Sequence, residues 1–298
     1  MNFLDVKTDY AFKKVFGSLE NKDILIDFLN SVLDFRKDNK IKDLSIVDPY
    51  NVPELKGMKD TYVDVKAVLD DDSKVIIEMQ VLNHQCFEKR ILYNAAKNYS
   101  TQLNKNENYN LLNPVIALTI VDFEMFKETD SIITNFKLLE KKEFINYNDD
   151  IELVFIELPK FTKELNELNG IQDQWIYFIK NAGSLEYIPK SLDSTVKHAL
   201  TIVNEANFTA DELETQHKRK EFISIQKLAI LKAEKDGIEM GIEKGIKKGI
   251  EKGIEKGIEM EKMQMAEKLL DVLDIATISE KTGLSVDQLN QIKNEHTF

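Results

Sequence analysis

Two consecutive segments in which apolar and polar residues alternate constrain the fold of this chain more than any other feature. The segments are residues 60–70 (DTYVDVKAVLD) and 74–82 (KVIIEMQVL), and the residues between them, Asp71, Asp72 and Ser73, are typical of a turn. Alternation with a period of two places successive side chains on opposite faces of a β-strand. The sequence therefore predicts an antiparallel hairpin with one apolar face.

The segments on either side of this hairpin predict further helices and strands. Apolar residues at helical spacing indicate helices, and alternation or short apolar runs indicate strands. The resulting order predicts an α/β fold, a mixed sheet flanked by helices, followed by a mainly helical C-terminal region. The expected elements are helices over 8–17, 21–33 and 85–103 and strands over 40–47, 114–123 and, as a pair, within 131–158.

Composition excludes several classes of protein. The chain has 298 residues with 40 Lys and Arg against 52 Asp and Glu, a net charge of −12, which disfavours coating nucleic acid through bulk charge but leaves a local basic groove open. Cys86 is the single cysteine, which excludes a disulfide scaffold or a Cys-based zinc site and favours a reducing compartment. No apolar run approaches the ~18 residues of a membrane span, and the N-terminus lacks the apolar stretch of a signal peptide. We therefore expect a cytoplasmic protein without membrane contact.

Two acidic residues stand at matching positions of the hairpin. A turn over residues 70–72 places Asp64 opposite Glu78, with Cβ atoms about 5 Å apart. Two carboxylates at this distance repel unless a cation lies between them, and Mg²⁺ takes oxygen ligands and keeps several waters. The alternative is a solvated polar face, which is common on antiparallel hairpins. If the apolar faces of the strands coincide, the other face carries Asp64, Lys66, Glu78 and Gln80.

Several blocks of the sequence are similar to those of a known family. An Asp in one strand, Glu-x-Gln in the next and then a helix resemble the core of the PD-(D/E)XK nucleases. More closely, the chain resembles the recombination-promoting nuclease/transposase (Rpn) family over roughly residues 5–125, and the glycine-rich repeat farther on is frequent in such proteins. The matching blocks, in order, are TDYAFKKVFG, NKDILIDFLNSVL, DVKAVLDDDSKVIIEMQ and FEKRILYNAAKNYSTQL.

The resemblance implies roles for the acidic residues. Asp64 and Glu78 match the two metal-binding acids of a restriction-endonuclease-like site, and the backbone carbonyl of Met79 is a plausible further ligand. Asp9 is a candidate additional acid, although an Asp in the first turn of a helix is also explained by the helix dipole. The implied chemistry is hydrolysis of DNA phosphodiester bonds assisted by Mg²⁺, with Mn²⁺ as a possible substitute.

One position departs from the superfamily pattern. Gln80 stands where the superfamily has a lysine, which helps to activate the attacking water and offsets phosphate charge. A glutamine can position the water but supplies no charge. Lys66 on the same predicted face and Arg90 on the following helix are the candidates to replace that lysine.

Residues 237–260 carry a tetrapeptide repeat, GIEM-GIEK-GIKK-GIEK-GIEK-GIEM, which contains six of the eleven glycines of the chain. A period of four exceeds the 3.6 residues of a helical turn, so each repeat drifts by about 40° around a helix. Each glycine also costs about 1 kcal/mol relative to alanine. Two interpretations stay open: a charged linker or helical stalk, and a helix stabilised by packing against a partner, with homodimerisation through this region.

The sequence divides the chain into four regions. The terminal ATISEKTGLSVDQLNQIK resembles a helix-turn-helix, but it offers little positive charge, so packing or self-association explains it at least as well as DNA binding. The predicted regions are a nuclease-like domain over 1–160, a helical region over 161–236 with an amphipathic helix over 211–235, the repeat stalk over 237–260 and a small helical module over 261–298.

These observations favour a Mg²⁺-dependent DNA endonuclease associated with recombination or mobile elements. The alternative is a catalytically weak nuclease fold that acts as an interaction protein through its repeat and its C-terminal helices.

Overall fold

The computed structural model of the chain describes residues 1–33, 40–51 and 61–295. The chain divides into two compact units, Met1–Lys227 and Leu228–Phe298. The finer division predicted within each of them stays a prediction. Among the described residues, no helix has the length and apolar character needed to cross a membrane.

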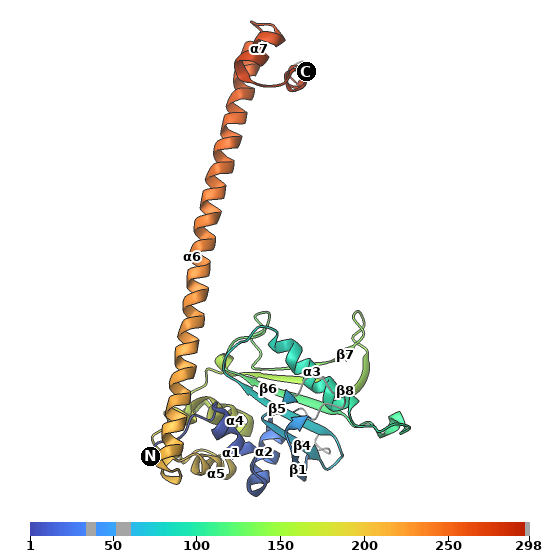
Figure 1. Ribbon diagram of the computed structural model, residues 1–298, viewed down its shortest axis with the longest axis vertical. Coiled ribbons are helices and arrows are strands. Elements are labelled where there is room, and N and C mark those ends of the chain that lie inside the picture. Colours follow the sequence, from blue (N-terminus) through green and yellow to red (C-terminus); the bar gives the residue numbers. More distant parts are fainter. Residues whose placement is uncertain (34–39, 52–60, 296–298) are drawn as a thin grey trace. The chain divides into compact units, whose positions relative to one another are not determined.

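A mixed six-stranded sheet forms the centre of the first unit (Figure 1). Its strand order is β1-β4-β5-β6-β8-β7, in which β5, β6 and β8 run parallel and the other neighbours pair antiparallel. Strand β6 is buried along its whole length, as expected of an apolar strand in the middle of a sheet. The strands are β1 (Leu44–Val47), β4 (Val65–Leu69), β5 (Lys74–Gln80), β6 (Val115–Val121), β7 (Ile133–Leu139) and β8 (Asn146–Glu157), with a separate pair, β2 (Tyr50–Asn51) and β3 (Thr61–Tyr62).

Strands β4 and β5 form the predicted hairpin in the predicted register. Val65 lies opposite Ile77, so the pairing continues in phase toward residues 64 and 78. The prediction of one unbroken strand over 60–70 is wrong, because β3 ends at Tyr62 and β4 begins only at Val65. Residue 60 lies outside the described residues.

Helices cover both faces of the sheet, which confirms the predicted fold class. On one face, α1, α2, α4 and α5 enclose an aromatic core in which the rings of Phe28 and Trp175 lie 5.9 Å apart. On the other face, α3 packs through Phe87, Ile91 and Ala95, which are four residues apart and form one apolar stripe. The helices are α1 (Asp9–Phe16), α2 (Lys22–Val32), α3 (Phe87–Ser100), α4 (Gly170–Asn181), α5 (Ser194–Ile202), α6 (Ala210–Leu269), α7 (Ile275–Thr282) and α8 (Val286–Glu295), with 3-10 turns at Leu19–Asn21, Tyr109–Leu111, Leu158–Lys160, Leu165–Glu167, Ala182–Ser184 and Glu205–Asn207.

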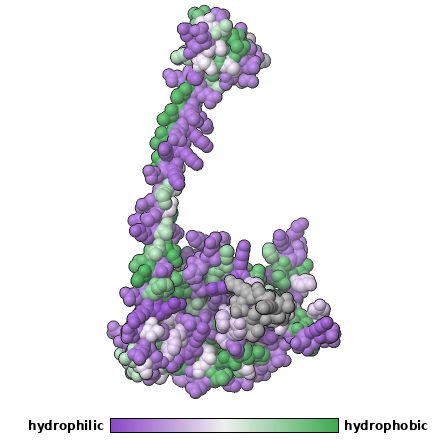
Figure 2. Space-filling model, in the orientation of Figure 1, coloured by the Kyte–Doolittle hydropathy of each residue, from purple (hydrophilic) through white to green (hydrophobic). Residues whose placement is uncertain are grey.

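Helix α6 is one continuous helix that begins in the first unit and continues into the second. The tetrapeptide repeat over residues 237–260 is therefore helical. Beyond the helix's own backbone, no atom of the described residues lies within 4 Å of where a Cβ would stand on the repeat glycines. Figure 2 shows hydrophobic residues running along one side of this segment. The repeat isoleucines are 49–59% exposed: Ile238, Ile242, Ile246, Ile250, Ile254 and Ile258.

The second unit ends in two short helices, α7 and α8. Gly283 ends α7 with a φ of 72°, a left-handed conformation that favours glycine. Ala266 at the end of α6 packs with Ile278, Leu284 and Leu289 in a small apolar core. The predicted helix, glycine turn and helix are confirmed.

Candidate functional site

Asp64 lies in a bend between β3 and β4. Its N–H donates to the Ile77 carbonyl at 3.1 Å, and its Oδ2 accepts a hydrogen bond from the Met79 N–H at 2.7 Å. The carboxylate thus binds an amide just beyond the end of the β4–β5 ladder. The bend also reverses the side-chain alternation: Val65 packs in the core beneath α1 and α2, whereas Val63 packs with α3. An unbroken strand would place both valines on one face.

Glu78 and Gln80 alternate with apolar residues on β5, on the face that α3 covers through Ile76. Arg90, in the first turn of α3, pairs with Glu78 through Nη2, and the same Nη2 donates to Gln80 Oε1 at 2.8 Å. Gln80 Nε2 donates to the Leu82 carbonyl at 2.7 Å. One guanidinium therefore joins two of the predicted side chains, and both ends of the Gln80 amide are engaged.

A cavity of about 260 Å³ brings six of the seven predicted site residues together. We call it the carboxylate cavity. Its walls come from the N-terminal loop, α1, the β4–β5 hairpin with the residues next to it, α3 and α6. It is lined by Lys7, Asp9, Asp64, Glu78, Met79, Gln80, Val81, Leu82, His84, Arg90, Arg219 and Ile223.

Lys66 is the predicted residue that does not line this cavity. It lies two residues farther along the strand than Asp64 and opposite Ile76, which at ~3.3 Å per residue is about 7 Å along the strand. Burial is the largest cause that lowers its pKa, and the charges of Lys74 and Lys97 lower it further. The structure therefore places Lys66 among other lysines and away from the acids.

Asp9, in the first turn of α1, adds a carboxylate beside Asp64. Lys13 contacts both, with Nζ 2.7 Å from Asp9 Oδ1 and 3.6 Å from Asp64 Oδ1. Burial opposes ionisation of Asp9, but hydrogen bonds with Lys13 and Asp64 outweigh it and lower the pKa of Asp9. Burial is also the main cause that raises the pKa of Asp64 to about 7, where the Met79 N–H opposes the rise and Asp9 adds to it. Asp64 therefore holds the proton of this pair.

Glu78 is a further carboxyl group whose ionisation the cavity disfavours. Burial raises its pKa, and the charge of Arg90 is the largest opposing effect. Within the described residues, no three His, Cys, Asp or Glu side chains gather closely enough to hold a metal ion by themselves. Asp64 and Glu78 are nevertheless a donor set that suits Mg²⁺ or Mn²⁺, since such ions bind through one or two carboxylates and keep several waters. The residues present fit a two-carboxylate site completed by water.

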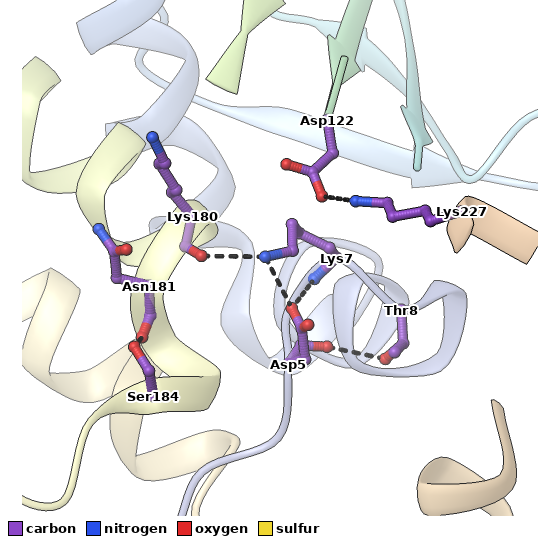
Figure 3. Close-up of polar contacts among 8 residues, drawn as sticks. All are labelled: Asp5, Lys7, Thr8, Asp122, Lys180, Asn181, Ser184 and Lys227. Atoms are coloured by element: carbon purple, nitrogen blue, oxygen red, sulfur yellow. Dashed lines mark hydrogen bonds and ion pairs between the residues drawn. The ribbon is translucent and has the colours of Figure 1, made fainter. Parts of the chain in front are cut away.

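The first part of α6 forms one wall of the cavity through Arg219 and Ile223. Lys227, one turn later, pairs with Asp122 at 2.6 Å, and Figure 3 shows this pair next to the segment that carries Lys7. The Lys7 Nζ donates to a backbone carbonyl of α4 at 3.1 Å. The sequence predicts an amphipathic helix here, but nothing in its spacing indicates that Arg219 belongs to the site.

Comparison with known proteins gives one match. A family model for PD-(D/E)XK nuclease family transposases matches residues 6–233, more than half of the chain. The matched region includes the hairpin, α3 and the part of α6 that lines the carboxylate cavity. No curated protein and no solved structure matches the chain.

Proposed function

Since this chain belongs to the PD-(D/E)XK nuclease family transposases, we propose that it is a divalent-metal-dependent endonuclease that hydrolyses phosphodiester bonds of DNA. The observation that carries the proposal is the carboxylate cavity, which Asp64 and Glu78 both line, and in which Asp64 accepts a hydrogen bond from Met79, the residue after Glu78. Mg²⁺ is the proposed ion, with Mn²⁺ as a substitute, and a role in recombination or in a mobile element is part of the same proposal.

In this mechanism Asp64 and Glu78 would hold the ion, together with the carbonyl of Met79. A bound divalent ion lowers the pKa of its water and offsets charge on the phosphate. The Met79 N–H keeps the Asp64 carboxylate in one orientation through the 2.7 Å hydrogen bond. The Asp64 proton, which burial and Asp9 retain near neutral pH, has to leave before the carboxylate becomes a ligand. Arg90 restrains Glu78 from the other side.

Plasmid cleavage with Mg²⁺, Mn²⁺ or EDTA tests this proposal. We expect metal-dependent nicking by the wild type and at least about a hundredfold loss in Asp64→Asn and Glu78→Gln. Asp72→Asn is the matched control, because it makes the same change in the turn of the same hairpin, where the φ of 65° suits asparagine. Absence of cleavage by folded wild type with either metal, or full cleavage by both variants, would contradict the proposal.

A second candidate function, action through self-association, rests on the repeat helix. Its six glycines cost about 6 kcal/mol in total relative to alanine, and like charges recur four residues apart, as in Glu239 with Glu243 and Lys252 with Lys256. A helix with these handicaps gains stability from a neighbour, and the exposed isoleucines beside open glycines provide a face for close packing. We propose that the neighbour is the repeat of a second copy, because one self-complementary face forms a symmetric dimer.

Sedimentation of the full chain tests self-association independently of cleavage. The double variant Ile246→Lys, Ile254→Lys places charge on the apolar line and should be monomeric where the wild type is dimeric. Glu251→Lys, which changes charge in the same repeat but off that line, should remain dimeric. A monomeric wild type, or a dimeric double variant, would refute pairing through the repeat.

A further inference from the structure

Gln80 leaves the carboxylate cavity without the positive charge that a lysine would supply at its position. Its amide is engaged at both ends, Oε1 by Arg90 and Nε2 by the Leu82 carbonyl. Arg90 is itself paired with Glu78 and so balances an acid of the protein. A cation that meets the negatively charged phosphate has to come from another part of the cavity.

Two lysines, Lys7 in the lining of the cavity and Lys13 beside its acids, are held by protein groups. The Lys7 Nζ donates to the Lys180 carbonyl at 3.1 Å and lies 3.6 Å from Asp5 Oδ1. The Lys13 Nζ lies 2.7 Å from Asp9 Oδ1. Either lysine would have to give up its present partner in order to bind a phosphate.

Arg219 is a cation of the cavity that no carboxylate holds. Its side chain is exposed, and it makes neither a hydrogen bond nor an ion pair with any residue that the structure describes. Its guanidinium lies 5.8 Å from the centre of the Phe222 ring, a contact that leaves its N–H groups available. Burial, which raises the pKa of Asp9, and the contacts with Lys13, which lower it, are the larger effects. The charge of Arg219 lowers this pKa further, so Arg219 lies close enough to act on an acid of the cavity.

Helix α6 is fixed on both sides of Arg219. Glu212, about two turns earlier, accepts a hydrogen bond from the Tyr10 hydroxyl at 2.6 Å. Lys227, about two turns later, pairs with Asp122 at 2.6 Å, as Figure 3 shows. Separations of seven and eight residues keep these three side chains on the same side of a helix with 3.6 residues per turn. The position of Arg219 at the cavity is therefore a product of the packing of the first unit.

We propose that Arg219 binds the non-bridging oxygens of the scissile phosphodiester and supplies the positive charge that Gln80 lacks. This inference rests on the proposed endonuclease function. A planar guanidinium presents two parallel N–H groups to two phosphate oxygens. It also offsets the negative charge that grows on the phosphate as water attacks. A lysine at the same position would keep the charge but lose the paired contact.

Cleavage kinetics of Arg219→Gln, Arg219→Lys and Lys218→Gln test the assignment. Lys218→Gln is the matched control, because it removes the same charge from the next residue, which is exposed and pairs with Glu214 on the helix surface. We expect Arg219→Gln to lower kcat/KM about a hundredfold, mainly through kcat. Arg219→Lys should recover part of this loss, and Lys218→Gln should match the wild type. Equal activity of Arg219→Gln and Lys218→Gln would overturn the assignment.

DNA binding in Ca²⁺ separates this inference from the endonuclease proposal and from a merely structural role. Affinity decreases as salt increases, and the steepness of log affinity against log salt concentration should be smaller by about 0.9 in Arg219→Gln, the value for one lost phosphate contact. It should not change in Lys218→Gln. A wild type that binds DNA in Ca²⁺ but cleaves it with neither Mg²⁺ nor Mn²⁺ would refute the endonuclease proposal, and the slopes alone would then decide on Arg219. An unchanged slope in Arg219→Gln, or no DNA binding by the wild type, would overturn the contact itself.

Discussion

Replacing Asp64 by asparagine should make the metal-free protein more stable near neutral pH, although it removes a proposed metal ligand. Asparagine has the same shape as aspartate. Its Oδ1 can accept the Met79 N–H in place of the carboxylate Oδ2, and its Nδ2 can donate to Asp9. The substitution therefore keeps the local contacts and removes only the need to ionise a largely buried group.

The size of the effect follows from the pKa of Asp64, which burial raises from 3.8 to about 7. Because the pKa is higher in the folded state than in the unfolded chain, the folded state binds more protons and loses stability as the pH rises from about 4 to about 7. This difference corresponds to about 4 kcal/mol once the pH is above 7. The Asp64 side chain is only 16% exposed, so solvent screening removes little of it. Asp64→Asn should match the wild type at about pH 4 and exceed it by up to about 4 kcal/mol at about pH 8.

Urea unfolding in EDTA, followed by fluorescence, measures this difference. Trp175 is the single tryptophan of the chain and is fully buried in the first unit, so its emission reports on the unit that contains Asp64. Linear extrapolation gives the free energy of unfolding of both proteins at each pH. A difference that does not change with pH, or an Asp64→Asn protein that is less stable at about pH 8, would refute the reasoning. Asp72→Asn serves as the control and should show no such pH-dependent gain.

Three further changes test other parts of the structure by the same unfolding measurement. Glu157→Gln should cost about 3 kcal/mol or more, because Glu157 is fully buried and its loss leaves the largely buried Lys160 ammonium without a carboxylate; a cost near zero would contradict this. Phe28→Ala should cost about 3–5 kcal/mol, since it opens a cavity in the aromatic core; a smaller loss would mean that the core collapses around it. Lys227→Gln should cost no more than about 1 kcal/mol, because its ion pair with Asp122 is partly exposed; a larger loss would show that this pair contributes more than its exposure suggests.

The elements of the fold were predictable where the signal is local. The hairpin register follows from the turn and from the two alternating strands, so the pairing of Val65 with Ile77 agrees with the sequence. The bend at Asp64 was not predictable, because it depends on a hydrogen bond between this side chain and the Met79 N–H of the next strand. Alternation also placed Lys66 on the acidic face, but a shared face does not show which side chains line one cavity, and Lys66 does not line it.

The site was predictable as far as Asp9 in the first helix, the hairpin and the helix after it. Glu78, Gln80 and Arg90 follow one another within a few residues of sequence, and the structure joins them through one guanidinium. Arg219 lies far along the chain from this group and reaches the cavity because the first part of α6 packs within the first unit. The sequence predicts that its helix is amphipathic. An amphipathic pattern indicates that one face of a helix is buried, but it does not indicate against which part of the protein.

The glutamine at position 80 does not by itself decide between a nuclease and an interaction protein. In a protein without nuclease activity, Asp64→Asn would be tolerated and would stabilise the fold. The reason is that ionising the buried carboxyl group costs the folded state about 4 kcal/mol above pH 7. A buried acid that lowers stability in this way is expected at a functional site, where a bound cation favours its ionised form. Functional sites keep such groups although a neutral residue would be more stable. Arg219 in the same cavity has the charge that the missing lysine would bring, whereas Arg90 is paired with Glu78. The stability of Asp64→Asn therefore bears on function: a large gain without metal, together with loss of cleavage, favours a nuclease that keeps Asp64 for its reaction over an interaction protein.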